Sequence, residues 1–237
     1  MGYTHYWDYK NPISEIAEIE KLRKAEYSRL RKRVEPKTDI WEEMAKFDKQ
    51  FQTKKQLNER VEKHIKAFKA AAKDIKHLLK NLPEHSFSAG GYHSEENIVI
   101  KGGLGKGKPI VNKNKIWLNG DGEKDLDHET FAIDLFETLP FYYEDYEIEK
   151  GVSGFCKTAR KPYDLVVCVS LLILKEHLGE DFDFSSDGGL EDWEQAILLY
   201  IKLFNRAINK DFLKKFAENE DELKKFISKT NLYQNTF

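Results

Sequence analysis

The sequence predicts an α+β fold: a mostly antiparallel sheet packed by helices, with an added helical hairpin or arm. Runs typical of short strands open the chain and return in its middle, and helical stretches lie between and after them. The 237 residues are 40% hydrophobic and 13% aromatic. This composition excludes a disordered chain and allows a sizeable core.

The first predicted strand covers residues 3–9, and two helical regions follow it. Asn11 caps and Pro12 starts the first helix. The second region opens at residue 38 or 39 and ends at 82, with a bend or break near residues 52–53. Its second half carries an apolar seam with alternating steps of four and three, formed by Val61, Ile65, Phe68, Ala72, Ile75, Leu79 and Leu82. Such a seam predicts packing against the first helix or against a partner subunit.

Shorter elements are predicted from residue 84 onward. Gly-rich and acidic loops separate five short strands, at 97–101, 110–111, 115–118, 130–134 and 141–146. After them come a helix from Pro162 to about Leu178, a strand at 182–185, and amphipathic helices at 190–205 and 211–229. We therefore expect residues 1–10 and 84–237 to form an α+β ligand-binding core. Residues 11–83 form a helical elaboration suited to oligomerisation.

The charge of the chain is balanced in total and uneven in distribution. Lys and Arg number 39 and Asp and Glu number 41, giving a formal net charge of -2. Residues 41–80 hold eleven basic and six acidic side chains, whereas residues 121–149 hold eleven acids and one lysine. An acidic stretch of this kind repels polyanions. The pattern therefore argues against a nucleic acid polymer and favours a small ligand held by a local cation cluster.

The sequence gives no sign of membrane insertion, export or a cofactor. The longest apolar run, residues 165–174, is far shorter than the roughly 20 residues of a membrane span. Residues 1–10 lack the basic and apolar regions of a signal peptide. Cys156 and Cys168 are too few for a disulfide scaffold or a four-ligand zinc site. We expect a reducing, cytoplasmic setting and predict neither a cofactor nor a metal.

The glycine-rich segment 101–109, KGGLGKGKP, matches the GxxxxGK spacing of a P-loop. A P-loop also needs a Ser or Thr after the lysine and a helix that follows. Pro109 occupies the hydroxyl position, and a strand is predicted next. The segment is therefore interpreted as a hairpin loop, with a lysine-bearing lid over an anionic ligand as the alternative.

Segment 119–130, NGDGEKDLDHET, carries candidate polar contacts. Its alternating acids resemble a calcium loop, but Leu126 stands where that loop requires glycine. His128 with Thr130 matches half of a two-histidine phosphoesterase site, and a general acid without its base is incomplete. Catalysis, a ligand contact and a structural turn all remain open for His128. The candidate polar wall consists of Asn119, Asp121, His128, Glu129 and Thr130.

Segment 155–164, FCKTARKPYD, predicts an anion site. Lys157, Arg160 and Lys161, with the hydroxyl of Thr158, lie just before Pro162, where a helix is expected to begin. The first turn of a helix offers free backbone N–H groups and the positive end of its dipole. An arginine adds a planar fork for phosphate or carboxylate. The alternative is a solvated helix start with incidental charges.

The opening segment GYTHYW is dense in aromatic rings with polar tips. On a strand, Tyr3, His5 and Trp7 share one face, and Thr4 and Tyr6 share the other. We expect one face to be core and the other to line a pocket, where rings can stack on a nucleobase. Thr4, His5, Tyr6 and Trp7 are the candidate base-pocket residues.

Segment 184–193, FSSDGGLEDW, places Asp187 in a turn between a strand and a helix. An aspartate there caps the following helix or holds a ribose hydroxyl, and the cap is the more common role.

These segments also carry a resemblance. GYTHYW, WLNGDGEKDLDHETF, GFCKTARKPYDLVV and FSSDGGLEDW resemble a largely uncharacterised family of phage and prophage-type proteins. The resemblance covers residues 2–7 and about 116–205, and leaves residues 38–82 and the tail after 210 unexplained. It implies a role against host defence in the host cytoplasm, for which one known strategy is to sequester a nucleotide second messenger.

The combined expectation is a protein that binds a small nucleotide-derived signal, such as a cyclic nucleotide or a cyclic ADP-ribose-like molecule, without cleaving it. Cations would hold phosphate, aromatics the base and carboxylates the ribose, and a homo-oligomer would bury the ligand. Because no catalytic set is complete, an enzyme is the alternative: a phosphoesterase or nucleotide hydrolase using His128 or His5, with a metal at Asp121, Asp125 or Asp127. A further alternative is an inhibitor that binds a host protein through the helical arm.

Overall fold

Strand β1 (Thr4–Tyr9) is the central strand of the main sheet. In the computed structural model, which describes residues 3–33, 39–86, 95–136, 152–206, 208 and 210–234, it pairs on both sides. Its neighbours are β5 (Val152–Lys157) and β6 (Phe182–Ser186), both antiparallel, in the order β5-β1-β6. The predicted strands at 3–9 and 182–185 are confirmed, and β5 is an additional strand. The segment expected to precede a helix therefore begins inside the sheet.

A second antiparallel sheet lies beside the first. It consists of β2 (Ile110–Val111), β3 (Lys115–Leu118) and β4 (Phe131–Asp134), in the order β2-β3-β4. These strands confirm the predictions for this part of the chain. The predicted strand at 97–101 forms only two isolated bridges, one at each end, and the predicted strand at 141–146 lies outside the described residues. The α+β class is confirmed, with both sheets antiparallel.

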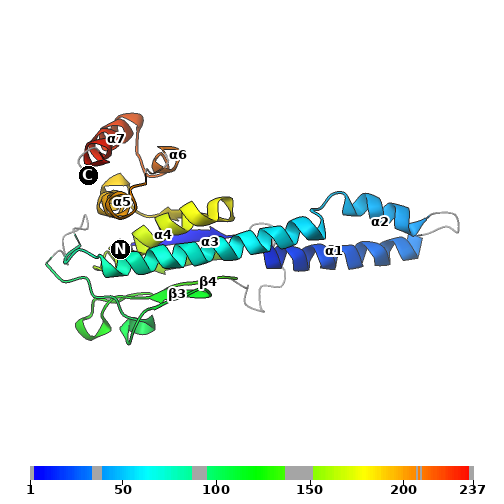
Figure 1. The fold of residues 1–237 in the computed structure, drawn as a ribbon, viewed down its shortest axis with the longest axis horizontal. Coiled ribbons are helices and arrows are strands. Elements are labelled where there is room, and N and C mark those ends of the chain that lie inside the picture. The colour runs from blue at the N-terminus through cyan, green and yellow to red at the C-terminus, as the bar shows by residue number, and fades with distance from the viewer. Residues whose placement is uncertain are drawn as a thin grey trace.

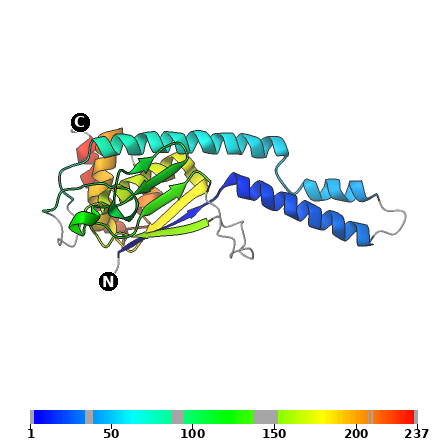
Figure 2. The ribbon, with the colours of Figure 1, turned by 90° about the horizontal axis from the view of Figure 1, so that it is seen from below.

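A helical arm projects from the body (Figures 1 and 2). It contains α1 (Pro12–Arg33), α2 (Ile40–Asp48) and the first part of α3 (Lys54–Lys80). Each helix starts at a capping side chain, since Asn11 Oδ1 accepts from the backbone N of Ile13 and Asp39 accepts from Trp41. Thr53 and Gln56 form a capping box, which explains the predicted break before α3.

The apolar seam of α3 packs mainly on a helix that the sequence analysis did not consider as its partner. Its residues Phe68, Ala72 and Ile75 are buried against α4 (Asp164–Leu178), with which α3 makes its most extensive contact. Contact with α1 is confined to fewer residues. Helix α4 is buried on nearly every side because α3, α5 and β6 surround it, which explains its almost uninterrupted apolar sequence.

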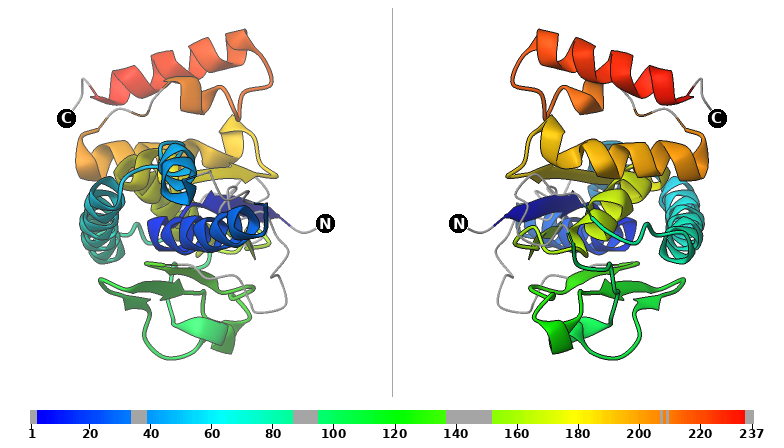
Figure 3. Two further views of the ribbon diagram at one scale, coloured as in Figure 1. Left: turned by 90° about the vertical axis from the view of Figure 1, so that its right-hand side faces the viewer. Right: turned by 90° about the vertical axis from the view of Figure 1, so that its left-hand side faces the viewer.

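Three further helices complete the body. They are α5 (Leu190–Phe204), the short α6 (Lys210–Leu213) and α7 (Glu220–Gln234), so the predicted helix at 211–229 is interrupted by a turn. Helix α7 lies outside α5, and α5 lies outside α4, on the side away from the second sheet (Figure 3). Among the described residues, no helix combines the length and apolar character that crossing a membrane requires.

Candidate functional site

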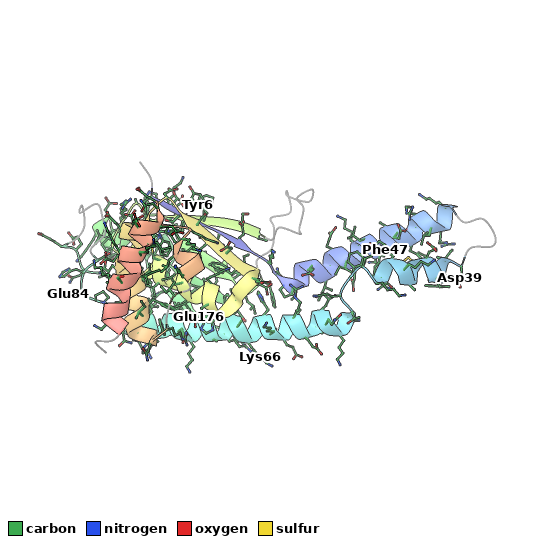
Figure 4. The ribbon with its side chains drawn as sticks, turned by 90° about the horizontal axis from the view of Figure 1, so that it is seen from above. Tyr6, Asp39, Phe47, Lys66, Glu84 and Glu176 are labelled. Atoms are coloured by element: carbon green, nitrogen blue, oxygen red, sulfur yellow. The ribbon has the colours of Figure 1, made fainter. Side chains whose placement is uncertain are left out.

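The main sheet buries one face and leaves the other open. His5, Trp7 and Tyr9 point to the buried face, while Tyr6 and Asp8 on the same strand are exposed. Figure 4 shows Tyr6 on the side of the body opposite to Lys66 of α3. This alternation confirms that one face of β1 belongs to the core, whereas the role of the other face in lining a ligand pocket stays a prediction. Thr4, on the same face as Tyr6, is buried.

A hollow of about 410 Å³ lies on the open face. This volume is in the range of small-molecule sites. Its lining comes from the three strands of the main sheet and from the segment before α7: Tyr6, Trp7, Asp8, Ser153, Gly154, Phe155, Asp183, Phe184, Ser185 and Lys215. Gly154 is required here, because a Cβ at this position would lie 2.5 Å from the ring of Trp7.

Two aromatic rings stand side by side in the hollow. Tyr6 and Phe155 are register partners on β1 and β5, and their exposed fractions are 44% and 55%. Neighbouring aromatic side chains on an open sheet offer a flat apolar surface to a planar ligand. Phe155 also lies 5.7 Å from the ammonium of Lys157, measured to the ring centroid. A positive charge therefore borders the stacking surface.

Charged and hydroxyl groups surround the rings. Asp8 accepts a 2.6 Å hydrogen bond from the hydroxyl of Ser153. Asp183 is paired with Lys215 through two contacts of 2.7 Å, and with Lys175 at 3.5 Å. Burial alone would raise the pKa of Asp183, but these ammonium groups outweigh it and lower the pKa. The hollow therefore offers carboxylate acceptors together with one ammonium group, that of Lys215, which is paired with Asp183.

Beneath the sheet, His5 and Thr158 belong to a buried network centred on Asp164. His5 Nε2 lies 2.8 Å from Asp164 Oδ1, and the Thr158 hydroxyl donates to the same carboxylate. His5 and Thr158 are fully buried, and Asp164 is 5% exposed. Because His5 has no access to solvent, it serves the interior of the protein, and it cannot contact a ligand in the hollow.

The loop between β5 and α4 is wrapped around the start of β1. The carbonyl of Tyr3 accepts from the backbone N–H groups of Thr158 and Ala159. Ala159 and Arg160 both have positive φ angles, 52° and 56°. The turn places the guanidinium of Arg160 4.2 Å from the ring centroid of Tyr3, where it also donates to Asp192 of α5. This loop therefore connects the first strand to two helices.

The three cations predicted to hold phosphate point to different neighbours. Arg160 is paired with Asp192, as above. Lys161 donates to the carbonyls of Asp125 and Asp127, both at 2.6 Å. The ammonium of Lys157 lies 4.0 Å from Glu129, and the side chain of Lys157 is about half exposed. Of the three, Lys157 is the cation that borders the open face of the sheet.

The predicted polar wall is a folded loop beside the second sheet. The side chain of Asn119 donates to the carbonyl of His128 and accepts from its backbone N–H. Asp121 accepts from the backbone N of Glu123 and lies 3.7 Å from Lys101. Asn119 also donates to Thr130 Oγ1. These contacts hold the loop together, and the role of its residues as a ligand-binding wall stays a prediction.

Asp187 does not cap the following helix, which corrects the preferred interpretation of its role. Gly189 is the N-cap of α5, and Asp187 Oδ2 accepts from the backbone N of Thr4 at 3.0 Å. The backbone N of Asp187 donates in return to the carbonyl of Thr4. Asp187 therefore extends the contact between β1 and the end of β6, through its side chain and its backbone.

Several residues of the hollow were missed by the sequence reasoning. Phe155 lay within a segment that was interpreted as a helix start, because β5 was not predicted. Lys215 comes from a distant segment that gives no local signal. Asp164, in the buried network beneath the sheet, did offer a signal: an acid directly before the apolar run 165–174 has to be buried with hydrogen-bonding partners.

Comparison of the chain with family models, with curated proteins and with solved structures finds no match in any of the three.

Proposed function

We propose that this protein binds and sequesters a small nucleotide-derived ligand on the open face of the β5-β1-β6 sheet. The observation that carries the proposal is the pair of exposed rings, Tyr6 and Phe155, beside a hollow of about 410 Å³. Exposed aromatic pairs on a sheet suit stacking with a base, which any nucleobase provides. A signal molecule such as a cyclic nucleotide or a cyclic ADP-ribose-like compound has this chemistry.

The groups around the rings support the same ligand class. Lys215 lines the hollow, and Lys157 lies beside Phe155 at its margin, so both suit a phosphate group. Asp8 and Asp183 suit the hydroxyls of a ribose. The proposed site keeps Tyr6 and Lys157 from the residues expected on sequence grounds. It assigns the remaining ones to the scaffold, among them Trp7, whose ring lies on the buried face.

The positions of His5 and His128 support binding of the ligand without cleavage. His5 is fully buried. The backbone of His128 is held by Asn119 in a loop of the second sheet, and His128 is not among the residues that line the hollow. Neither histidine is therefore placed as an acid or base for a ligand stacked on Tyr6.

The decisive experiment measures binding and fate of the ligand together. Titration calorimetry with AMP, cyclic AMP, a cyclic dinucleotide and cyclic ADP-ribose should identify at least one binder. Heating the complex and analysing the released compound by chromatography should return it unchanged. Light scattering of the same samples is expected to give a mass above that of one chain, because a second copy would cover the open side of the hollow.

Variants assign the site. Tyr6→Ala and Phe155→Ala each remove a ring on which a base can stack. Such stacking contributes about 1–3 kcal/mol per base, so the affinity for the ligand should fall about 5- to 150-fold. Trp41→Ala is the matched control, since Trp41 is a 71% exposed aromatic residue on the arm, and its affinity should be that of the wild type. Full affinity in both sheet variants would contradict the placement of the site. If none of the four compounds binds, the exposed Trp41 makes host-protein binding through the arm the better proposal.

A further inference from the structure

The buried end of β1 brings together three side chains that ligate metals. His5 comes from β1, and Asp164 and Cys168 lie one turn apart on α4. All three are buried, with exposed fractions of 0%, 5% and 1%. One ligand atom of each lies within 4.8 Å of the others. The cluster lies beneath the sheet and is separate from the hollow on the open face.

The separations inside the cluster approach those of a tetrahedral metal site. Ligand atoms around a tetrahedral zinc ion lie about 3.3–3.6 Å apart, given the usual bond lengths. Cys168 Sγ lies 3.6 Å from His5 Nε2 and 3.8 Å from Asp164 Oδ2. The shorter separation, 2.8 Å between His5 Nε2 and Asp164 Oδ1, needs to widen by about half an ångström.

The charge of the cluster favours a divalent cation. Asp164 is a buried acid whose described side-chain contacts are with His5, Thr158 and Cys168, and none of them comes from a lysine or an arginine. Arg160 interacts electrostatically with Asp164, but its guanidinium donates its hydrogen bond to Asp192. A divalent ion with one carboxylate, one thiolate and one neutral imidazole forms an assembly without net charge, which avoids the cost of an uncompensated buried charge.

The other nitrogen of His5 supplies a second, independent observation. Nδ1 is buried and has no hydrogen-bond partner among the described residues, and the same is true of Nε1 of Trp193, whose ring centroid lies 5.5 Å from that of His5. A histidine that ligates through Nε2 carries its proton on Nδ1 and passes it to an outer partner, often water. Two unpartnered polar atoms in this position are suitable partners for one ordered water.

We propose that His5 Nε2, Asp164 and Cys168 Sγ bind a divalent transition metal ion of the zinc type, with water or the second carboxylate oxygen in the fourth position. On binding, Cys168 releases its thiol proton to solvent and the imidazole proton resides on Nδ1. The ion would link β1 to α4, and so fix the strand that carries Tyr6. Because the cluster is fully enclosed, the metal would be acquired during folding. This proposal is independent of the proposed ligand.

The metal content of the purified protein tests the proposal directly. Inductively coupled plasma mass spectrometry should find close to one zinc per chain in protein expressed with zinc and washed with a chelator. Protein unfolded with chelator and refolded with Co²⁺ should develop a sulfur-to-cobalt charge-transfer band. Less than one tenth of an equivalent of metal, together with no such band, would overturn the proposal and leave a metal-free hydrogen-bonded network.

The second cysteine of the chain gives a matched control. Cys156 is also fully buried, but its thiol donates to the carbonyl of Glu129, outside the cluster. Cys156→Ala should keep the metal and the cobalt band, whereas Cys168→Ala and His5→Gln should lose both. Circular dichroism reports whether each variant folds. A folded Cys168→Ala protein that retains a full equivalent of metal would place the ion elsewhere and refute the assignment.

Discussion

The body and the arm of this protein both contain long helices but differ in how those helices are stabilised. In the body, α4 is buried along almost its whole length, and α3 is buried there at Phe68, Ile75 and Leu78. In the arm, the described part of α1 has two buried apolar residues, Pro12 at its start and Leu30, and α2 has one, Met44. The arm relies instead on caps and on exposed ion pairs such as Arg23 with Asp48.

The comparison teaches where the free energy of folding is concentrated. Burial of apolar surface contributes about 25 cal/mol per Å², whereas an exposed ion pair contributes less than about 1 kcal/mol. The body can therefore hold an aromatic pair in an exposed position on a rigid sheet. The arm is expected to open locally at a lower free energy than the body does.

The largest expected effect comes from removing a buried ring in the body half of α3. Phe68→Ala should lower the free energy of unfolding by about 3–5 kcal/mol, because Phe68 is fully buried and its loss leaves a cavity. Denaturant titration followed by circular dichroism measures the change. Leu22→Ala in the arm, where the side chain is 39% exposed, is the control and should cost less than about 0.5 kcal/mol. Equal losses in the two variants would remove the distinction between body and arm.

An intermediate effect is expected at the junction of the two regions. Asp181 contacts His64 at 3.3 Å and Arg60 at 3.5 Å, and both partners lie on α3. Burial alone would raise the pKa of Asp181, but the hydrogen bond from His64 and the charge of Arg60 outweigh it, so the pKa is lowered.

A carboxylate whose pKa is lowered by folding contributes stability above its unfolded pKa of about 3.9, and this stability is lost as the pH falls through the folded value. Asp181→Asn should therefore cost about 1 kcal/mol at pH 7 and much less below about pH 3. Urea titrations at the two pH values measure both differences. A cost that is the same at both would show that the charge of Asp181 does not matter.

The smallest effect is expected within the arm itself. Arg23→Ala removes the exposed 2.7 Å contact with Asp48 between α1 and α2 and should change global stability by a few tenths of a kcal/mol. Hydrogen exchange of the α1 amides is the sensitive measurement, since it detects local opening. Faster exchange confined to α1 and α2 is expected, while exchange that also rises in α4 would mean that the two regions unfold together.

Local patterns predicted the elements well where caps and periodicity are encoded in neighbouring residues. Asn11 and Asp39 started helices where expected, because each satisfies backbone groups of its own helix. The partner of the α3 seam could not be read in the same way. Seven apolar positions specify a face, but any apolar helix of suitable length can cover it, and here α4 does.

The candidate site was predicted in its pieces and not in its arrangement. Clustering in sequence suggested that Lys157, Arg160 and Lys161 act together. The chain turns at Ala159 and Arg160, which have positive φ angles, and the side chains of the three cations point to different neighbours. Phe155 was hidden because the glycine in β5 weakens its strand signal, although that glycine makes room for Trp7. Such close approaches depend on the tertiary structure and leave no periodic pattern in the sequence.

The position of β1 has a consequence for synthesis on the ribosome. This strand is made before both of its neighbours, which lie more than roughly 140 residues later in the chain. At a translation rate of about 5–20 residues per second, roughly 10–40 seconds pass between the synthesis of β1 and that of β6. The α1–α2 hairpin depends on contacts within about the first 50 residues and can form during that interval. The nascent chain would therefore hold an unpaired aromatic strand beside an already folded helical arm, a stage at which a chaperone could engage it.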